Sequence, residues 1–393
     1  MVKVINRTIL ILSIVSLFAD IASEMLYPVI PVYLKEIGFS VLLIGILEGV
    51  AGFTAAFTKG YFGRLSDQKG YRLPFVKAGY LLSAISKPMM AAFAIPLWIF
   101  FARTIDRLGK GLRTAARDAL LSENATIQTK GEVFGFHRSM DTLGAAIGPT
   151  IALLFLLFFP GEYVMLFLLA FIPGAISVFL LFYIKENRTS PTDSKKGTFF
   201  SYLSYWNIAG QQYKKLVSGL LLFALVNSSD VFLLLKTKEI TNSDTITIGV
   251  YIFYNLVFAL AAYPIGRLAD KLGLKNVLIS GLFLFALVYL LFGIANNVTI
   301  IIVAFFLYGS YAAATEGISK AWVTNIAHNE NTATAVGFFT SLESIGTLLA
   351  SIIAGAAWQL FGSSVTFFIA SIGSTLVLFY FIIVFKSKAI VAE

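Results

Sequence analysis

Long apolar runs separated by short polar turns recur along the whole chain. Each run is long enough to cross the hydrocarbon core of a bilayer as a helix, which takes about 20 residues. The only other structure that spans a membrane is a closed β-barrel, whose strands are short and alternate, and these runs do neither. The sequence therefore predicts an all-α membrane protein with twelve transmembrane helices. The runs cover residues 8–33, 41–61, 74–95, 97–115, 135–159, 161–184, 216–236, 246–266, 276–295, 299–322, 333–358 and 363–385.

The composition excludes a water-soluble protein. Of the 393 residues, 58% are hydrophobic and 13% are charged, whereas soluble domains are usually about 45–50% apolar and about 25% charged. The chain has no cysteine, and its two histidines are His137 and His328. Disulfides are therefore excluded, a metal site built from His or Cys is not expected, and His137 is expected to be structural. The first run is too long for a signal peptide and lacks a clear cleavage site.

Basic residues predict the orientation of the helices. Fourteen Lys and Arg residues lie in the turns after the second, fourth, sixth and eighth runs, whereas the opposite turns hold three. Lys and Arg accumulate in the cytoplasmic loops of membrane proteins, so we expect both termini in the cytoplasm and the protein in the cell (cytoplasmic) membrane. The net charge of +9 then belongs to short cytoplasmic turns, and no nucleic-acid partner is expected.

One short motif occurs twice. The stretch "GRLSDQKGYR" begins at Gly63 after the second run, and "GRLADKLGLKN" begins at Gly266 after the eighth, about 203 residues later. Equivalent positions in two halves predict two pseudo-symmetric six-helix bundles related by an axis along the membrane normal. The expected domains are residues 1–184 and 216–393. Residues 185–215 between them are expected to form a polar cytoplasmic linker that ends in an interfacial helix rich in aromatic residues.

The repeated motif resembles the signature loop of the major facilitator superfamily, G-x-L-x-D-x-x-G-x-[RK]. The matching residues are Gly63, Leu65, Asp67, Gly70 and Arg72, with a looser match at Gly266, Leu268, Asp270 and Gly273. The resemblance implies the major facilitator fold and a gating loop that latches the two halves together when the transporter faces outward. We expect Arg113 or Arg117 to be the partner of Asp67. A turn that only sets topology and holds helices is the alternative.

A second glycine pattern lies in the fifth run. Gly135, Gly144, Gly148 and Pro149 fit G-x8-G-x3-G-P, which resembles the motif of proton-coupled drug antiporters. That pattern continues with two glycines, where this chain has Ala152 and Leu153. Ordinary close packing of helices through small residues is the alternative.

Charged residues also lie inside predicted spans, where a charge costs about 2.5–3.5 kcal/mol on insertion scales. The fourth run carries Arg103, Asp106, Arg107 and Lys110, and its Arg107 and Gly111 resemble the superfamily motif R-x-x-Q-G, with Lys110 in place of Gln. In the first run, Asp20 and Glu24 share one helical face. We expect Asp20 and Glu24 to carry a proton, with Arg103 or Arg107 as the alternating partner. Buried ion pairs that only fix the helices, including Asp106, are the alternative.

Further polar residues are candidates for a central substrate cavity, because the resemblance implies that spans one, four, seven and ten line it. Glu316 and Lys320 are four residues apart and can neutralise each other, which is the structural alternative for them. Tyrosines in the tenth run can stack on an organic substrate or simply pack. The candidates are Glu48, Lys87, Asp230, Tyr308, Tyr311, Glu316, Lys320 and Glu343.

These features predict a secondary transporter that uses alternating access. The sequence shows no nucleotide-binding loop and no nucleophile constellation, so neither ATP, another cofactor nor an enzymatic activity is expected. We expect proton-coupled efflux of small organic compounds by a monomer. Sodium is the alternative coupling ion. The alternative is proton-coupled uptake or exchange of a specific metabolite, an anionic one included. Unpaired cavity cations favour uptake, whereas full pairing with Asp20, Glu24 and Asp106 favours efflux. Short loops without a sensory domain argue against a membrane receptor.

Overall fold

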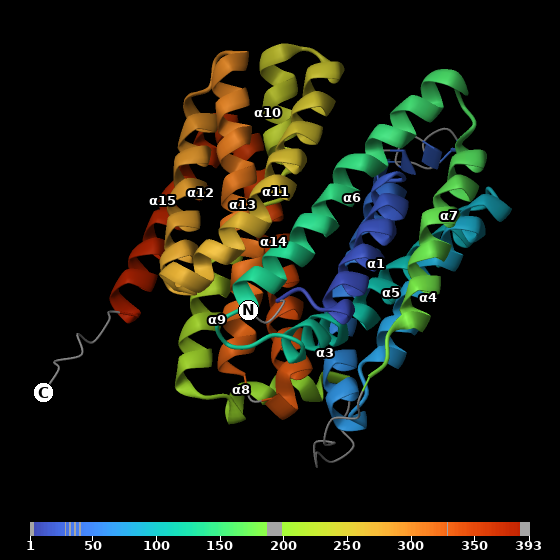
Figure 1. Ribbon diagram of the computed structural model, residues 1–393. Helices are drawn as coiled ribbons and strands as arrows, with labels where there is room; N and C mark the ends of the chain where they lie inside the picture. Colours follow the sequence, from blue (N-terminus) through green and yellow to red (C-terminus); the bar gives the residue numbers. More distant parts are fainter. Residues whose placement is uncertain are drawn as a thin grey trace, which may run out of the picture.

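The computed structural model describes residues 4–27, 29–30, 33–34, 37–38, 41–186, 199–327 and 329–385. Two groups of long helices stand side by side (Figure 1). The first group consists of α1 Arg7–Glu24, α3 Val41–Lys69, α4 Leu73–Ala92, α5 Pro96–Glu123, α6 Lys130–Phe158 and α7 Tyr163–Leu180. The second consists of α9 Gln211–Ala224, α10 Val231–Thr241, α11 Asp244–Leu272, α12 Leu274–Ile294, α13 Val298–Ile326, α14 Thr332–Phe361 and α15 Ser363–Val384. We call the first group the N-half and the second the C-half.

Most predicted spans coincide with one long helix each. By length and hydropathy alone, seven of the described helices qualify as membrane spans. The helix α5 is not among them because it carries many charged residues. These charges line the space between the halves, where water and oppositely charged partners lower their free-energy cost. On the outside, large apolar side chains such as Phe179, Leu260 and Leu376 are more than half exposed, as a lipid-facing surface requires.

Two predicted spans end or break differently from the expectation. The helix α1 ends at Glu24, short of the predicted Tyr33. The seventh span, predicted as one helix over 216–236, is interrupted between α9 and α10. The interruption contains the polar segment around Ser229, whose backbone N–H donates to Ser351 Oγ at 3.0 Å. Backbone groups freed inside a membrane protein are tolerated where they line a cavity or find such partners, and this break does both.

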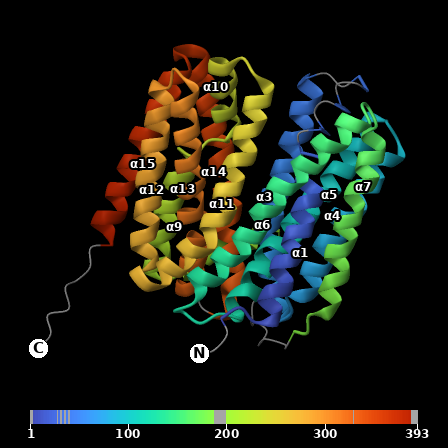
Figure 2. The same ribbon diagram turned by 45° about the horizontal axis from the view of Figure 1, so that its top comes forward.

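The two halves meet at one end and diverge towards the other (Figure 2). The helix α6 packs along α11, and α3 packs along α14, so both seams join one half to the other. The end at which α3 and α11 finish is the end at which α6 and α14 begin. We call it the latch end.

The segment between the halves contacts both of them. Residues 187–198 of the predicted linker lie outside the described residues. The described part, η2 Phe199–Ser204 and α8 Tyr205–Ile208, is short and helical, as expected of an interfacial segment. The Tyr202 hydroxyl lies 3.0 Å from Ser341 Oγ on α14, and Arg64 on α3 donates to the Ser201 carbonyl. This segment therefore covers the seam between α3 and α14.

Candidate transport site and gate

The first copy of the repeated motif caps a helix of the opposite half. Asp67 lies near the end of α3, and its carboxylate accepts from the backbone N–H of Thr334 at 2.6 Å and from that residue's hydroxyl at 2.5 Å. These groups belong to the first turn of α14, where free N–H groups and the helix dipole favour an anion. Gly63 lies one turn earlier, and a Cβ there would collide with the Ala333 carbonyl. The motif therefore closes the latch end through a helix cap.

The second copy repeats this arrangement in the other direction. The Asp270 carboxylate on α11 accepts from the backbone N–H of Gly131 at 2.8 Å and of Glu132 at 2.6 Å, in the first turn of α6. A Cβ at Gly266 would collide with the Gly131 carbonyl, as a Cβ at Gly63 would collide with the Ala333 carbonyl. Each half thus caps a helix of the other half, and the two caps are related by the pseudo-symmetry that the repeat predicted.

The basic partner of Asp67 differs from the prediction. Arg72, in the same loop, lies 2.6 Å from Asp67 and also pairs with Glu123 at 3.1 Å. Its loop bends at Gly70, whose φ of 68° suits glycine. The expected partners are engaged elsewhere: Arg113 donates to Ser83 Oγ at 2.7 Å and lies over the Tyr80 ring, and Arg117 pairs with Asp118 at 2.9 Å. Both point along α5 into the space between the halves, away from the end of α3.

The two copies are not equivalent in charge. Lys275 stands in the second copy where Arg72 stands in the first, but its ammonium donates to the Phe385 carbonyl at the end of α15. Of the two caps, only the one at Asp67 is also held by a buried salt bridge from a basic residue of the same loop, Arg72.

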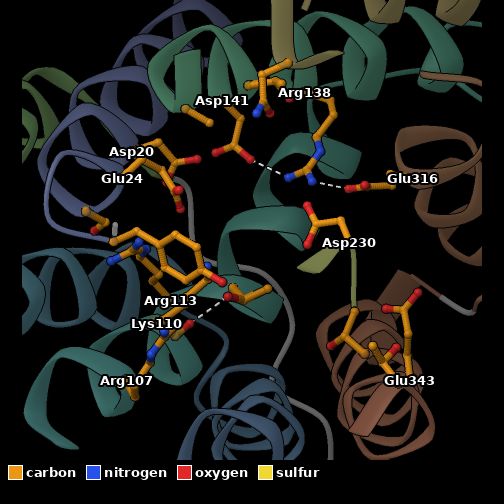
Figure 3. A pocket seen from close by; sticks show the side chains of 18 of the residues that line it. Asp20, Glu24, Arg107, Lys110, Arg113, Arg138, Asp141, Asp230, Glu316 and Glu343 are labelled. Carbon is orange, nitrogen blue, oxygen red and sulfur yellow. Dashed lines mark hydrogen bonds and ion pairs between the residues drawn. The ribbon is translucent and has the colours of Figure 1, made fainter. Parts of the chain in front are cut away.

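A polar cavity of about 510 Å³ lies between the halves beyond the latch. Among the described residues, its walls carry eight basic and seven acidic side chains, drawn from both halves. Figure 3 shows ten of these charged residues around the opening. The charged lining residues are Asp20, Glu24, Lys59, Arg103, Asp106, Arg107, Lys110, Arg113, Arg117, Arg138, Asp141, Asp230, Glu316, Lys320 and Glu343.

The centre of this cavity holds a pair of carboxyl groups that the sequence analysis did not identify. Asp20 on α1 and Asp141 on α6 both line the cavity, and their side chains point towards each other (Figure 3). Two carboxyl groups can share a hydrogen bond only when one of them holds a proton. Their helices approach closely because Gly144 faces the Leu17 carbonyl and the Asp20 Cβ. The signal in the sequence was a pair of charges, Arg138 and Asp141, inside the glycine-rich fifth run.

Arg138 connects this carboxyl pair to the C-half. Its guanidinium donates to Asp141 at 2.5 Å and to Glu316 on α13. A second ion pair crosses between the halves nearby, where Lys320 on α13 lies 2.8 Å from the fully buried Asp118 on α5. Glu316 and Lys320 were expected to neutralise each other. Each instead pairs with an opposite charge in the N-half, because both side chains project from α13 towards that half.

The other charged residues that were predicted for the site in the N-half lie either in the cavity wall or in an ion cluster beside it. Asp106 pairs with Lys87 at 2.6 Å and with Arg103 at 3.5 Å, so these three form a buried ion cluster between α4 and α5. Lys87, predicted for the cavity, lies behind its wall. Arg107 and Lys110 remain in the cavity wall, where their charges act on Glu24. The side chain of Glu48 lies outside the described residues.

In the second half, Asp230 and Glu343 line the cavity as predicted, but Tyr308 and Tyr311 do not. Asp230 lies at the break before α10 and accepts from the Tyr254 hydroxyl at 2.8 Å. The described tyrosines of the cavity are Tyr27 and, on α11, Tyr251 and Tyr254, and the ring centroids of the last two lie 5.4 Å apart. Tyr308 and Tyr311 are buried in the C-half core. At about 100° per residue, Tyr311 lies about 140° around α13 from Glu316, and Tyr308 about 80°.

The glycines of the fifth run all make close helix contacts. Gly144 and Gly148 face α1, and Gly135 faces the Ala262 carbonyl on α11. The helix α6 continues through Pro149. Packing through small residues explains these positions, and the same helix carries Asp141 and Arg138 between the two contacts.

Comparison with known proteins gives a consistent family. The sequence profile of the Major Facilitator Superfamily matches residues 12–253 and 216–391. An uncharacterized MFS-type transporter of Methanocaldococcus jannaschii is 32% identical over 362 residues, which cover 91% of this chain and 89% of the relative. The multidrug resistance protein MdtG of Klebsiella pneumoniae is 25% identical over 149 residues, 37% of this chain and 36% of the relative. The crystal structure of the human organic anion transporter MFSD10 superposes with a TM-score of 0.84 at 17% identity, over 95% of this chain and 99% of that one.

Proposed function

Because this chain belongs to the major facilitator superfamily, we propose that it is a proton-coupled secondary transporter that exports small organic compounds by alternating access. Membership makes it a multi-pass membrane transporter and not an enzyme. The observation that supports proton coupling is a row of four charged side chains, from Asp20 through Asp141 and Arg138 to Glu316. The row begins in the N-half and ends in the C-half.

The proton is carried by the Asp20–Asp141 pair. With one proton shared, Asp141 retains a negative charge for Arg138, and Arg138 ties α6 to Glu316 on α13. A second proton neutralises Asp141, so Arg138 loses one of its two carboxylates and the tie to the C-half weakens. Removal of that proton restores the tie. The protonation state of the pair thus biases the closed latch end, as an alternating-access mechanism requires.

We assign the closed latch end to the cytoplasm, in agreement with the orientation that the distribution of Lys and Arg predicts. The structure then corresponds to an outward-facing conformation. Protons enter from outside, loosen the latch end and allow the cavity to open inward. Export follows if the compound enters the inward-facing cavity from the cytoplasm as the proton leaves the cavity to the cytoplasm. The predicted domains, 1–184, 185–215 and 216–393, and a monomeric state belong to the same proposal.

The charge balance of the cavity supports export over uptake of an anion. Arg103, Arg117, Arg138 and Lys320 each have a carboxylate partner, so at least half of the eight cavity cations among the described residues are compensated. In the C-half, Asp230 lies beside Tyr251 and Tyr254, and aromatic rings next to a carboxylate suit an organic group with a basic nitrogen. The partial similarity to a multidrug resistance protein points in the same direction. Uptake or exchange of an anionic metabolite at Arg107 and Lys110 remains the second candidate.

A transport assay tests this function. Purified protein is first screened for thermal stabilisation by organic cations, anions and neutral compounds, and a stabilising compound is then followed in proteoliposomes with an imposed pH gradient. We expect wild type to follow the pH gradient, and Asp20→Asn to lose gradient-driven transport while the compound still stabilises it against heat. Transport that requires a sodium gradient and ignores the pH gradient would refute proton coupling.

A further inference from the structure

A buried histidine next to the proposed proton pair has no hydrogen-bond partner. His137 on α6 is 3% exposed, and neither ring nitrogen bonds to any group that the structure describes. Leaving a buried polar group unpaired costs about 1–3 kcal/mol, and ordered water often supplies the missing bond. A water beside the ring would supply the hydrogen bond that no described residue supplies.

A small cavity adjoins this ring. It has a volume of about 20 Å³ and is separate from the central cavity, whose lining does not include His137. A single water needs about 10–15 Å³ measured in this way, together with two to four polar partners. Besides His137, the polar groups that line it are Arg117, Arg138, Asp141, Glu316 and Lys320. The space therefore fits one water with ample partners.

The position of His137 along α6 places the small cavity between the proposed proton pair and the latch end. His137 precedes Asp141 by four residues, so the two side chains share a face and His137 lies one turn closer to the latch end. The proposed proton pair opens to the central cavity on one side, and the small cavity lies on its other side, towards the latch.

We propose that the small cavity holds one water that hydrogen-bonds His137, and that His137 relays the transported proton from Asp141 towards the latch end. This inference rests on the proton coupling proposed above. In the transfer, the protonated Asp141 carboxyl gives its proton to the water, and the water gives one of its own protons to an unprotonated ring nitrogen. Asp141 becomes a carboxylate, His137 becomes an imidazolium, and the water is unchanged. The imidazolium then loses its proton to bulk water when the latch end opens.

The surrounding charges make this transfer depend on the separation of the halves. Charged groups face the ring from three helices: Arg117 and Asp118 on α5, Arg138 and Asp141 on α6, and Glu316 and Lys320 on α13. While the latch end is closed, Lys320 neutralises Asp118 and its charge opposes an imidazolium. When α13 moves away, Lys320 leaves with it, and Asp118, which then keeps Arg117 alone as its basic partner, can stabilise the new positive charge.

The histidine content makes the site directly observable. The variant His328→Asn leaves His137 as the only histidine, so ¹⁵N-labelled imidazole gives one residue's signals in lipid nanodiscs. We expect a cross-peak between a ring nitrogen and a slowly exchanging water at pH 8, and an imidazolium signal on acidification that Asp20→Asn suppresses. A ring without a water contact that stays neutral at every pH at which the protein is folded would overturn the relay.

Transport separates this inference from the proposed function. His137→Gln keeps a polar side chain of similar size, and we expect it to slow gradient-driven transport about tenfold or more while substrate exchange stays near wild type. If Asp20→Asn abolishes the response to the gradient and His137→Gln leaves it at the wild-type rate, the relay is wrong and proton coupling stands. If neither substitution alters the response, both ideas fail.

Discussion

The Asp67 carboxylate on α3 accepts a hydrogen bond of 2.6 Å from the backbone N–H of Thr334, at the start of α14 in the other half of the molecule. Asp270 makes the equivalent contact with the start of α6. Both bonds must break whenever the latch end opens. The two caps therefore set how much free energy separates the closed conformation from the open one.

Removal of either cap charge should favour the open latch end, and the first cap should matter more. Asp67→Asn leaves the buried Arg72 without its nearest carboxylate, and breaking a buried pair costs about 3–5 kcal/mol. Asp270→Asn, the matched control, weakens only a helix cap, worth about 0.5–2 kcal/mol. Distances between spin labels on the two halves should lengthen in both variants, and more in Asp67→Asn. Turnover should fall with the same ranking. Equal effects would contradict the special role of Arg72.

A side chain at Gly63 should prevent closure of the latch end. The Cβ of Gly63→Val would collide with the Ala333 carbonyl, and a backbone carbonyl cannot rotate away as a side chain can. We expect transport to fall at least about tenfold. Because a Cβ at Gly63 also lies 3.0 Å from the Ala115 Cβ in the same half, the activity is normalised to the amount of folded protein. Gly249→Ala, on α11 with open space around its Cβ position, is the control and should transport normally. Wild-type activity in Gly63→Val would refute the close contact.

Arg138 should stabilise the closed conformation through two carboxylates. Arg138→Gln removes both, leaves Asp141 buried without a cation, and should lower the free energy of unfolding by about 1–3 kcal/mol. Glu316→Gln removes only the partly exposed inter-half pair and should cost about 0–1 kcal/mol. Thermal unfolding in one detergent measures the difference. A larger loss in Glu316→Gln than in Arg138→Gln would show that the pair with Asp141 is unimportant.

Asp230 should bind the cationic nitrogen of the substrate. Tetraethylammonium serves as the probe, and thermal stabilisation of wild type by this cation should be lost in Asp230→Asn. Tyr254→Phe removes the hydroxyl that donates to Asp230 and should weaken the stabilisation without abolishing it. Glu343→Gln, which changes another acid of the C-half wall, is the control. Stabilisation by organic anions but not by cations would favour the uptake candidate instead.

The sequence predicted most of the helices and the two equivalent copies of the motif, because both depend on local patterns. Apolar runs of bilayer length define spans, and a repeated motif places Asp67 and Asp270 in equivalent turns. The interruption of span seven was missed because its flanking runs are apolar on both sides of a four-residue polar segment. The N-caps across the halves follow from the motif only once the start of α14 is known to lie beside the end of α3.

The partners of the charged residues could not be predicted, because distance between helices is not a property of either helix. Arg113 and Arg117 were the expected partners of Asp67, whereas the fold places Arg72 at 2.6 Å. Asp20 was identified from its depth in span one, but its neighbour Asp141 depends on the close approach at Gly144. The displacement of Tyr308 and Tyr311 from the cavity reflects the rotation of α13, which Glu316 and Lys320 fix by pairing with the N-half.

The most direct test measures the opening of the latch end as a function of pH. The chain has no cysteine, so spin labels can be placed at Ile127→Cys and Leu272→Cys, two exposed positions on opposite halves at the latch end. Labels at Phe158→Cys and Leu360→Cys report on the other end in a separate sample. Electron–electron distances are recorded in nanodiscs between pH 8 and pH 5.

We predict that acidification lengthens the latch-end distance and shortens the distance at the other end. Asp141→Asn, which neutralises the partner of Arg138 permanently, should be open at the latch end at every pH. Asp20→Asn leaves Asp141 as a single carboxylate held by Arg138 and should stay closed at every pH. Distances that do not change with pH in wild type, or that change equally in all three proteins, would contradict a proton site at the Asp20–Asp141 pair.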